Sequence, residues 1–110
     1  MSDSLCQMND KSEKQGGVLV VMVEVDPEHE DELNRWYDEE HIPEKLATPG
    51  FRSARRFVDP AGGRYLAIYE LDDPAVATSD AYMSQELSDW TKSVMTTWRS
   101  WDRSVWRELP

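Results

Sequence analysis

The feature that most constrains the fold is an uninterrupted apolar stretch near the start of the chain. Residues Val18–Val25 (VLVVMVEV) are β-branched and apolar up to Glu24, which is typical of a strand buried near the middle of a sheet. Both faces of such a strand need cover from other parts of the protein. A chain of 110 residues is expected to form one small domain, so the remaining elements must assemble around this strand.

Residues 1–16 precede this strand and are rich in polar residues without periodicity, which predicts a disordered N-terminal tail before a folded domain over residues 17–110. The tail holds the single cysteine, Cys6, so no internal disulfide is expected, and a reducing compartment fits. No apolar run suits a signal peptide or a membrane span, and we therefore expect a cytoplasmic protein. The net charge of −10 argues against nucleic acid and anionic membranes as partners.

The first helix is predicted to begin at Asp26-Pro27, with Asp26 as N-cap and Pro27 at the first helical position. It is expected to run to about His41. Because proline lacks a backbone N–H, Pro43 should end this helix and begin a short turn through residues 44–47.

The next two segments, Phe51–Val58 and Arg64–Leu71, alternate in polarity and flank the turn-rich residues 59–63, so we expect an antiparallel hairpin. One face of the first strand is predicted to carry Phe51, Ser53, Arg55 and Phe57. The opposite face is predicted to carry Arg52, Ala54, Arg56 and Val58. On the second strand, the residues predicted to share a face are Tyr65, Ala67, Tyr69 and Leu71.

A second helical region is predicted from Asp72-Asp73-Pro74, with a break near Thr78-Ser79, to about Trp101. An apolar stripe of helical period supports it. Its members are Met83, Leu87, Trp90, Val94, Trp98 and Trp101. The three tryptophan rings are expected to cover a face of the sheet, and residues Arg103–Leu109 are predicted to form a final strand.

This order of elements, β-α-β-β-α-β, predicts an α+β, ferredoxin-like domain in which two helices cover one face of a four-stranded antiparallel sheet. The strands nevertheless carry apolar or aromatic residues on both faces. We expect the second face to pack against its copy in another subunit, which predicts a homodimer.

The strongest functional lead is the stripe formed by Leu33, Trp36, Tyr37, Glu40 and His41, which share one face of the first helix. This stripe is apolar at its start and ionisable at its end, so its last groups need water, a partner or a ligand. His41 titrates near neutral pH and suits proton transfer to or from a small substrate. An equally weighted interpretation is that His41 only caps the C-terminus of the helix.

The segment LNRWYDEEHIPEKLATPGFRSARRF resembles the dimeric α/β-barrel superfamily, and within it the small bacterial proteins with a WYxxEHIP…PGFxxAxR[FY] signature, which are related in fold to EthD-like proteins and stress-responsive barrel proteins. The resemblance covers about Val18 to Leu109. It implies a barrel formed by two four-stranded sheets across a two-fold axis, with a ligand pocket between sheet and helices in each subunit.

The superfamily includes cofactor-independent quinone-forming monooxygenases, muconolactone isomerases, polyketide cyclases, hydroxynitrile lyases and haem-dependent enzymes. The resemblance implies that His41 faces the pocket, that Trp36 and Tyr37 are the WY pair, and that Arg55 or Arg56 is the basic position before the aromatic residue. Several haem-binding relatives use a histidine on the second helix. This chain has no histidine after His41, so haem is not expected unless His41 itself is the ligand.

Other cofactor chemistry has little support in the residues. Glu39-Glu40-His41 is a contiguous run, which lacks the i, i+4 spacing that places two histidine ligands on one helical face. The sequence shows no P-loop, dinucleotide fingerprint or nucleophile elbow. We therefore expect neither a metal nor an organic cofactor.

Together these observations predict a cofactor-independent enzyme of isomerase, cyclase or lyase type acting on an aromatic or carbonyl-bearing metabolite, with His41 and Tyr37 as catalytic residues. The residues expected to bind the substrate are Trp36, Glu40, Arg55, Phe57, Tyr69 and Trp90. Cofactor-independent oxygenation of a phenolic substrate is a variant. The alternatives are a non-catalytic dimeric protein that binds a hydrophobic metabolite, and a scaffold whose tryptophans fill the pocket.

Overall fold

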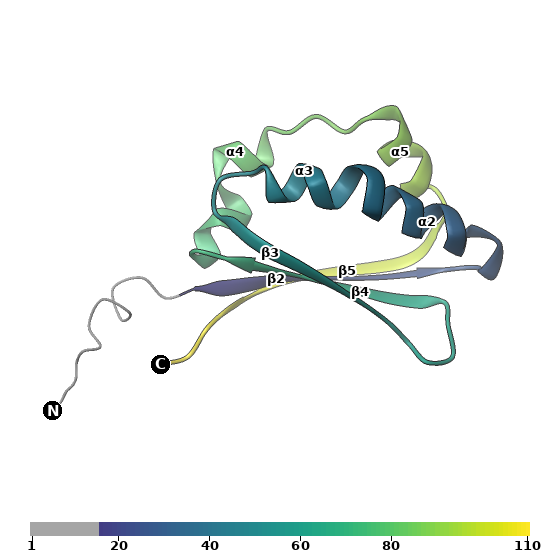
Figure 1. The fold of residues 1–110 in the computed structure, drawn as a ribbon, viewed down its shortest axis with the longest axis horizontal. Coiled ribbons are helices and arrows are strands. Elements are labelled where there is room, and N and C mark those ends of the chain that lie inside the picture. The colour runs from purple at the N-terminus through teal and green to yellow at the C-terminus, as the bar shows by residue number, and fades with distance from the viewer. Residues whose placement is uncertain (1–15) are drawn as a thin grey trace, which may run out of the picture.

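The computed structural model describes residues 16–110, so the tail predicted for residues 1–16 lies, except for Gly16, outside the described residues, as does Cys6. The sheet is four-stranded and antiparallel, with the order β3-β4-β2-β5 (Figure 1). Its strands are β2 (Gly17–Val25), β3 (Phe51–Val58), β4 (Arg64–Leu71) and β5 (Trp98–Arg107). The apolar β2 is a central strand, and the ferredoxin-like α+β arrangement is confirmed.

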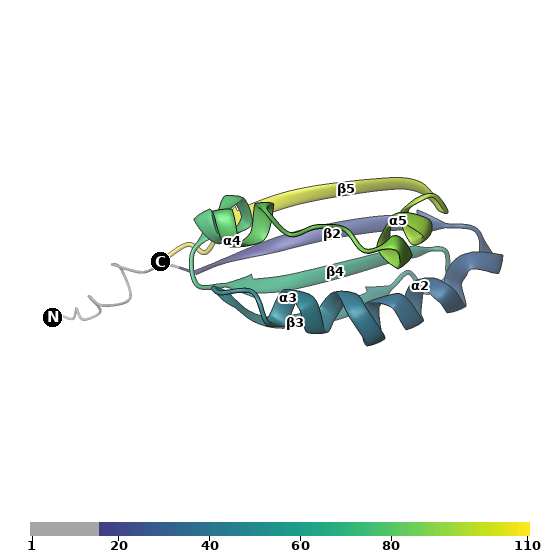
Figure 2. The same cartoon turned by 90° about the horizontal axis from the view of Figure 1, so that it is seen from above.

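The first crossover is helical from Pro27 to Leu46 and lies over the β3–β4 side of the sheet (Figure 2). Its segments are η1 (Pro27–His29), α2 (Glu30–Trp36), the π-helical η2 (Tyr37–His41) and α3 (Ile42–Leu46). The expectation that Pro43 ends the helix is wrong. The Ile42 N–H bonds to the Tyr37 carbonyl, five residues back, and this widened turn relieves the clash that a proline ring makes with the carbonyl four residues earlier.

The second crossover lies on the same face of the sheet but is not one long helix (Figures 1 and 2). It consists of η3 (Pro74–Thr78), α4 (Asp80–Met83) and α5 (Asp89–Met95), with irregular backbone over residues 84–88. The Ser79 and Ser88 hydroxyls accept the N–H groups of Tyr82 and Thr91, so each helix has its own N-cap. These caps begin two short helices where the sequence predicted a continuous one.

The predicted helical stripe in this region is also wrong. Met83 and Leu87 are 62% and 52% exposed, and both Trp98 and Trp101 belong to β5. The register between β2 and β5 shifts at Glu24 and Val25, so Trp98 lies opposite Val25 while Trp101 lies opposite Val23. This bulge brings residues three apart onto one face of a strand, which mimics helical spacing.

A second bulge, between Phe51 and Ser53, corrects the predicted faces of β3. Phe51 pairs with Leu71 and Ala54 pairs with Tyr69, so Phe51, Ala54 and Arg56 face the helices. Ser53, Arg55 and Phe57 face the opposite side. The face predicted for β4 is confirmed, since its residues Tyr65, Ala67, Tyr69 and Leu71 are all buried.

The core lies between the sheet and the helices, and its largest fully buried side chains are Trp36, Tyr69, Leu19, Leu33, Leu71, Val23 and Val94.

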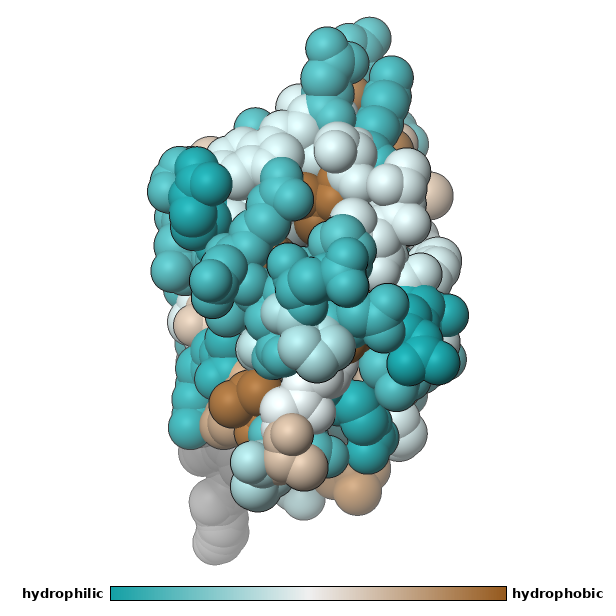
Figure 3. All heavy atoms as spheres, turned by 90° about the vertical axis from the view of Figure 1, so that its right-hand side faces the viewer, coloured by the Kyte–Doolittle hydropathy of each residue, from teal (hydrophilic) through white to brown (hydrophobic). Residues whose placement is uncertain are grey.

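The end of the molecule viewed in Figure 3 is largely hydrophilic, with only small apolar areas. The sheet face turned away from the helices carries apolar side chains that no described element covers. Among the described residues, no helix is long and apolar enough to cross a membrane.

Candidate functional site

His41 lies in the π-helical turn, packed between aromatic side chains. Its ring stacks on Trp36 with centroids 4.2 Å apart and meets the edges of Tyr37 and Tyr69 at 5.4 and 6.4 Å. Because the helix continues through Leu46, the interpretation of His41 as a C-terminal cap is wrong. We call Trp36, Tyr37, His41, Arg56 and Tyr69 the His41 cluster.

The π turn is the local device that builds this contact. Residues five apart point in different directions on a regular α-helix, so Trp36 and His41 would not meet. A turn with i→i−5 hydrogen bonds holds more residues and brings the two side chains together. Trp36 and Tyr37 are 1% and 2% exposed and anchor the turn in the core.

Arg56 reaches the cluster from β3 and lies against aromatic faces. Its Cζ atom is 4.0 Å from the ring centroid of Tyr37 and 5.4 Å from that of Tyr65. Its Nη1 donates to the Asn34 side-chain oxygen at 2.9 Å. Burial lowers the pKa of Arg56, yet a guanidinium stays charged in proteins. The predicted site includes Arg55 and not Arg56, although the signature has its basic residue directly before the aromatic one, which is the position of Arg56 before Phe57.

Lys45 is a second cation near the cluster that the sequence did not point to. Its side chain is 9% exposed, donates to the Gln85 side chain and lies 4.8 Å from the ring centroid of Tyr82. Burial lowers the pKa of Lys45, and the neighbouring Glu44 opposes that shift. The Gln85 amide in turn donates to Thr48 at 2.6 Å, so Gln85 ties the irregular segment 84–88 both to α3, through Lys45, and to the corner that follows it.

The protonation states follow from burial and from these cations. Burial, helped by the positive charges of Lys45 and Arg56, lowers the pKa of His41 to about 3, so its imidazole is neutral at neutral pH. Burial raises the pKa of Tyr37 to about 12 and also raises that of Tyr69, so both phenols keep their protons. The cluster thus offers a neutral imidazole, two phenols and one guanidinium.

Several buried polar atoms in and around the cluster have no hydrogen-bond partner. Among the described residues, the buried side-chain polar atoms without a hydrogen-bond partner are His41 Nδ1, Arg56 Nε and Nη2, the Tyr69 hydroxyl and Trp98 Nε1. The Glu44 carboxylate is 4.0 Å from His41 Nδ1, too far for a hydrogen bond. Trp98 also borders the cluster, with its ring centroid 6.1 Å from that of Trp36.

Glu40 anchors the turn to α5. Its carboxylate accepts hydrogen bonds from Ser88 and, at 2.9 Å, from the hydroxyl of Thr91, which itself accepts the Trp36 indole N–H at 3.0 Å. The bond from Ser88, more than that from Thr91, lowers the pKa of Glu40. The Glu40 carboxylate therefore connects α5 to the residues that carry His41.

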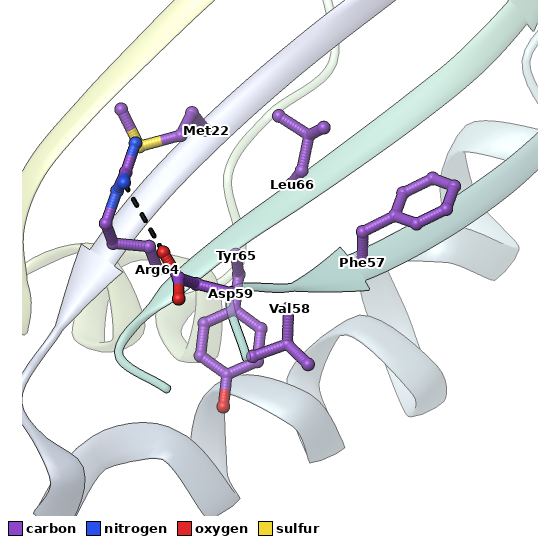
Figure 4. A pocket seen from close by; sticks show the side chains of 7 residues that line it. All are labelled: Met22, Phe57, Val58, Asp59, Arg64, Tyr65 and Leu66. Carbon is purple, nitrogen blue, oxygen red and sulfur yellow. Dashed lines mark hydrogen bonds and ion pairs between the residues drawn. The ribbon is translucent and has the colours of Figure 1, made fainter. Parts of the chain in front are cut away.

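Three of the residues predicted to bind substrate are not brought to His41. Arg55 and Phe57 lie on the other face of the sheet, with the Arg55 Cζ atom 5.1 Å from the Phe57 ring centroid. Figure 4 shows Phe57 directed away from the helices, in a hollow of about 250 Å³. Trp90 packs over α2, where its indole donates to Glu32 and its ring lies 5.4 Å from the Arg35 guanidinium carbon.

The cluster residues Trp36, Tyr37 and Tyr69 do lie beside His41, as the stripe on the first helix and the alternation of β4 led us to expect. Within the described part of the chain, no group of three or more His, Cys, Asp and Glu side chains is placed to hold a metal ion.

Comparison with known proteins places the domain among similar folds. The family model described as "Domain of unknown function (DUF4286)" matches residues 17–103. A Streptomyces coelicolor monooxygenase (ActVA-Orf6), solved in complex with nanaomycin D, has a TM-score of 0.71 at 14% identity over 87% of this chain and 89% of its own. No curated protein sequence matches this chain significantly.

Two further solved structures show the same fold. An antibiotic biosynthesis monooxygenase has a TM-score of 0.60 at 17% identity, covering 86% of this chain and 97% of its own. A conserved protein from Methanosarcina mazei Go1 has a TM-score of 0.66 at 14% identity, covering 87% and 95%. At these identities the likeness establishes the fold alone.

Proposed function

This chain belongs to the family described as a domain of unknown function (DUF4286), and we propose that it is a cofactor-independent enzyme that moves a proton on a small aromatic or carbonyl-bearing molecule held beside His41. The observation that carries the proposal is the set of buried polar atoms without partners around the Trp36–Tyr37 pair. Buried polar groups in folded proteins are nearly always hydrogen-bonded, so an unsatisfied group calls for a specific explanation. A bound small molecule supplies one.

In this proposal His41 is the general base. Its neutral imidazole has a free Nδ1, which takes a proton from the carbon next to a carbonyl or from a phenol. The negative charge that develops on the substrate oxygen is stabilised by the Arg56 guanidinium and by the hydroxyl of Tyr69. Because an anion beside His41 favours the imidazolium, the substrate itself raises the low pKa of His41 during the reaction.

The fate of the anion sets the reaction class. Reprotonation elsewhere gives an isomerisation, attack on a second carbonyl gives a cyclisation, and loss of a leaving group gives a lyase reaction. Transfer of one electron from the anion to O₂, combination of the substrate radical with superoxide, protonation by the imidazolium and loss of water from the hydroperoxide give a cofactor-independent oxygenation. The fold shared with two structures described as monooxygenases supports this oxygenation variant.

The alternative is a binding protein that holds a hydrophobic metabolite at the same place without turning it over. The low pKa of His41, about 3, favours this alternative because a general base works best when its pKa lies near the operating pH. Both functions use the same residues, so kinetics must separate them.

The test is a turnover screen of aromatic ketones, lactones and hydroquinones with the wild-type protein and His41→Gln. If His41 is the base, the substitution should lower kcat about 10²-fold or more. His29→Gln is the matched control, since His29 lies on η1 in contact with Glu28 and should leave kcat unchanged. Binding that changes only in affinity, with no turnover by the wild-type protein, would establish the binding function instead.

We also propose that the active form is a homodimer joined through the sheet face opposite the helices. In Figure 4, Met22 and Leu66 point away from the helices together with Phe57, which is 40% exposed. Trp106 on β5, opposite Val18 in register, is 59% exposed at the border of a second hollow of about 310 Å³. Exposed apolar surface of this kind is typical of an interface.

Analytical ultracentrifugation tests this assembly. The wild-type protein should sediment with twice the chain mass of 12.8 kDa at micromolar concentration. Leu66→Asp, which places a charge between Met22 and Phe57 in the sheet register, should sediment as a folded monomer. A wild-type mass near 12.8 kDa would rule out the two-sheet barrel.

A further inference from the structure

The unpartnered atoms of the His41 cluster are rich in hydrogen-bond donors. Arg56 Nε and Nη2 can only donate, the Tyr69 hydroxyl can donate, and the neutral His41 imidazole can present either a donor or an acceptor at Nδ1. Trp98 Nε1, which borders the cluster from the edge strand β5, is also only a donor. A group that satisfies Arg56 and Tyr69 together must therefore provide acceptor oxygens.

The charge around Arg56 leads to the same requirement. Of the other seven arginines, four have a carboxylate within 4.0 Å, namely Arg35, Arg52, Arg64 and Arg99. Arg55 and Arg107 have no such pair among the described residues but are exposed, and Arg103 donates to the Ala77 carbonyl. Among the described residues, Arg56 has no such carboxylate; its hydrogen-bond partner is the neutral amide of Asn34. The exposed Asp38 acts on Arg56 only from beyond ion-pair distance. Although the chain carries 22 acidic residues, this half-buried cation has no counter-charge within ion-pair distance among the described residues.

The arrangement around this cation suits a planar ligand. Arg56 and His41 both contact Tyr37, and Tyr69 lies on the neighbouring strand, opposite Ala54 in the register. Trp36 and Tyr37 already stack on His41 and Arg56, so a ligand ring that joins the cluster must enter from the solvent side of His41. Lys45 adds positive charge on the His41 side, and the 20% exposure of the His41 side chain gives the cluster contact with solvent. An anion entering here meets two cations.

We propose that the ligand of the His41 cluster is an aromatic carboxylate, whose oxygens accept hydrogen bonds from the Arg56 guanidinium and the Tyr69 hydroxyl. A guanidinium matches a carboxylate in geometry and gives strong charge-assisted hydrogen bonds. The inference names the ligand class of the proposed function and shares with it the location beside His41. It requires binding only, not turnover.

The experiment compares 1-naphthoate with its neutral analogue 1-naphthamide on the wild-type protein. Binding is followed by titration calorimetry and by the NMR shifts of the histidine rings, which assign binding to His41 rather than His29. We expect 1-naphthoate to bind at least 10-fold more tightly than 1-naphthamide and to raise the pKa of His41, because its negative charge favours the imidazolium. Equal affinities, or no saturable binding of either compound, would overturn the proposal.

Variants then assign the preference to Arg56. Arg56→Gln should abolish the preference for the carboxylate, whereas the matched variant Arg55→Gln, on the other face of β3, should keep it. Arg56→Lys keeps the charge but loses the planar fork, and should bind 1-naphthoate with intermediate affinity. A full preference retained in Arg56→Gln would refute the assignment. The comparison of the two compounds on the wild-type protein remains valid even if a variant fails to fold. Turnover of neutral compounds alone would refute the proposal of a carboxylate ligand but would leave the proposed proton-transfer function intact.

Discussion

Replacing Thr91 with valine tests the link between α5 and the residues that carry His41. The Thr91 side chain is buried, accepts the Trp36 indole N–H at 3.0 Å and donates to the Glu40 carboxylate at 2.9 Å. Valine has nearly the same shape but no hydroxyl. Thr91→Val therefore removes these two hydrogen bonds, and a third that the hydroxyl accepts from Ser88 at 3.1 Å, while it leaves the packing volume almost unchanged.

The expected loss of stability can be estimated bond by bond. Trp36 is 1% exposed, so its N–H would be buried without a partner, at a cost of about 1–3 kcal/mol. Glu40 keeps its hydrogen bond from Ser88 and has access to water, so losing the hydrogen bond from Thr91 to Glu40 should cost less than ~1 kcal/mol. We expect Thr91→Val to lower the free energy of unfolding by about 2–3 kcal/mol.

Urea unfolding at fixed protein concentration, followed by circular dichroism, measures this difference. Thr91→Ser is the matched control, because it keeps the hydroxyl and removes one methyl group, at a cost of about 1 kcal/mol. A Thr91→Val protein within ~0.5 kcal/mol of wild type would show that these hydrogen bonds contribute nothing net. A second readout is the His41 ring: if Thr91 holds Trp36 against His41, Thr91→Val should raise the pKa of His41 toward its ordinary value, whereas Thr91→Ser should not.

Three further predictions concern His41 and the Gly50 corner. The pKa of His41 falls from 6.5 to about 3 on folding. Below pH 6.5 the unfolded chain therefore binds a proton at His41 that the folded protein does not bind, and the free energy of unfolding decreases as the pH falls from 6.5 toward 3. Above pH 6.5 His41 is neutral in both states and costs no stability. Between pH 6.5 and 4.5 the wild type should lose about 2 kcal/mol more than His41→Gln, and parallel pH profiles in urea unfolding would refute the low pKa. Lys45→Met removes a nearby positive charge, so the pKa of His41 measured by NMR should rise; an unchanged value would mean that burial and Arg56 set it without Lys45. Gly50→Ala should cost more than about 2 kcal/mol, because Gly50 has φ +94° and a Cβ there would lie 2.4 Å from Val76. The control Gly62→Ala, with φ +84° and only the Glu30 side chain near its Cβ, at an ordinary 3.8 Å, should cost about 1 kcal/mol. Similar losses in the two glycine variants would exclude the contact with Val76 as the cause.

The sequence determined the parts of this protein that depend on one segment at a time. The apolar run of β2 specifies a central strand, because residues of that kind are buried on both faces. The spacing of Leu33, Trp36 and Tyr37 specifies the buried face of the first helix, and the alternation of β4 specifies which face Tyr69 occupies. In each case the period of hydrophobicity follows from the geometry of a single element.

The tertiary structure decided which charged residue joins His41. The bulge between Phe51 and Ser53 forms against β4, and with it Phe51 and Arg56 face the helices while Arg55 faces away. The bulge in the β2–β5 pairing places Trp98 and Trp101 on one face of a strand instead of on a helix. The π turn before Pro43 lets the first helix continue past His41. Each of these irregularities adds or shifts one residue to suit a partner strand or a packed neighbour, so its position depends on contacts distant in sequence rather than on the local pattern.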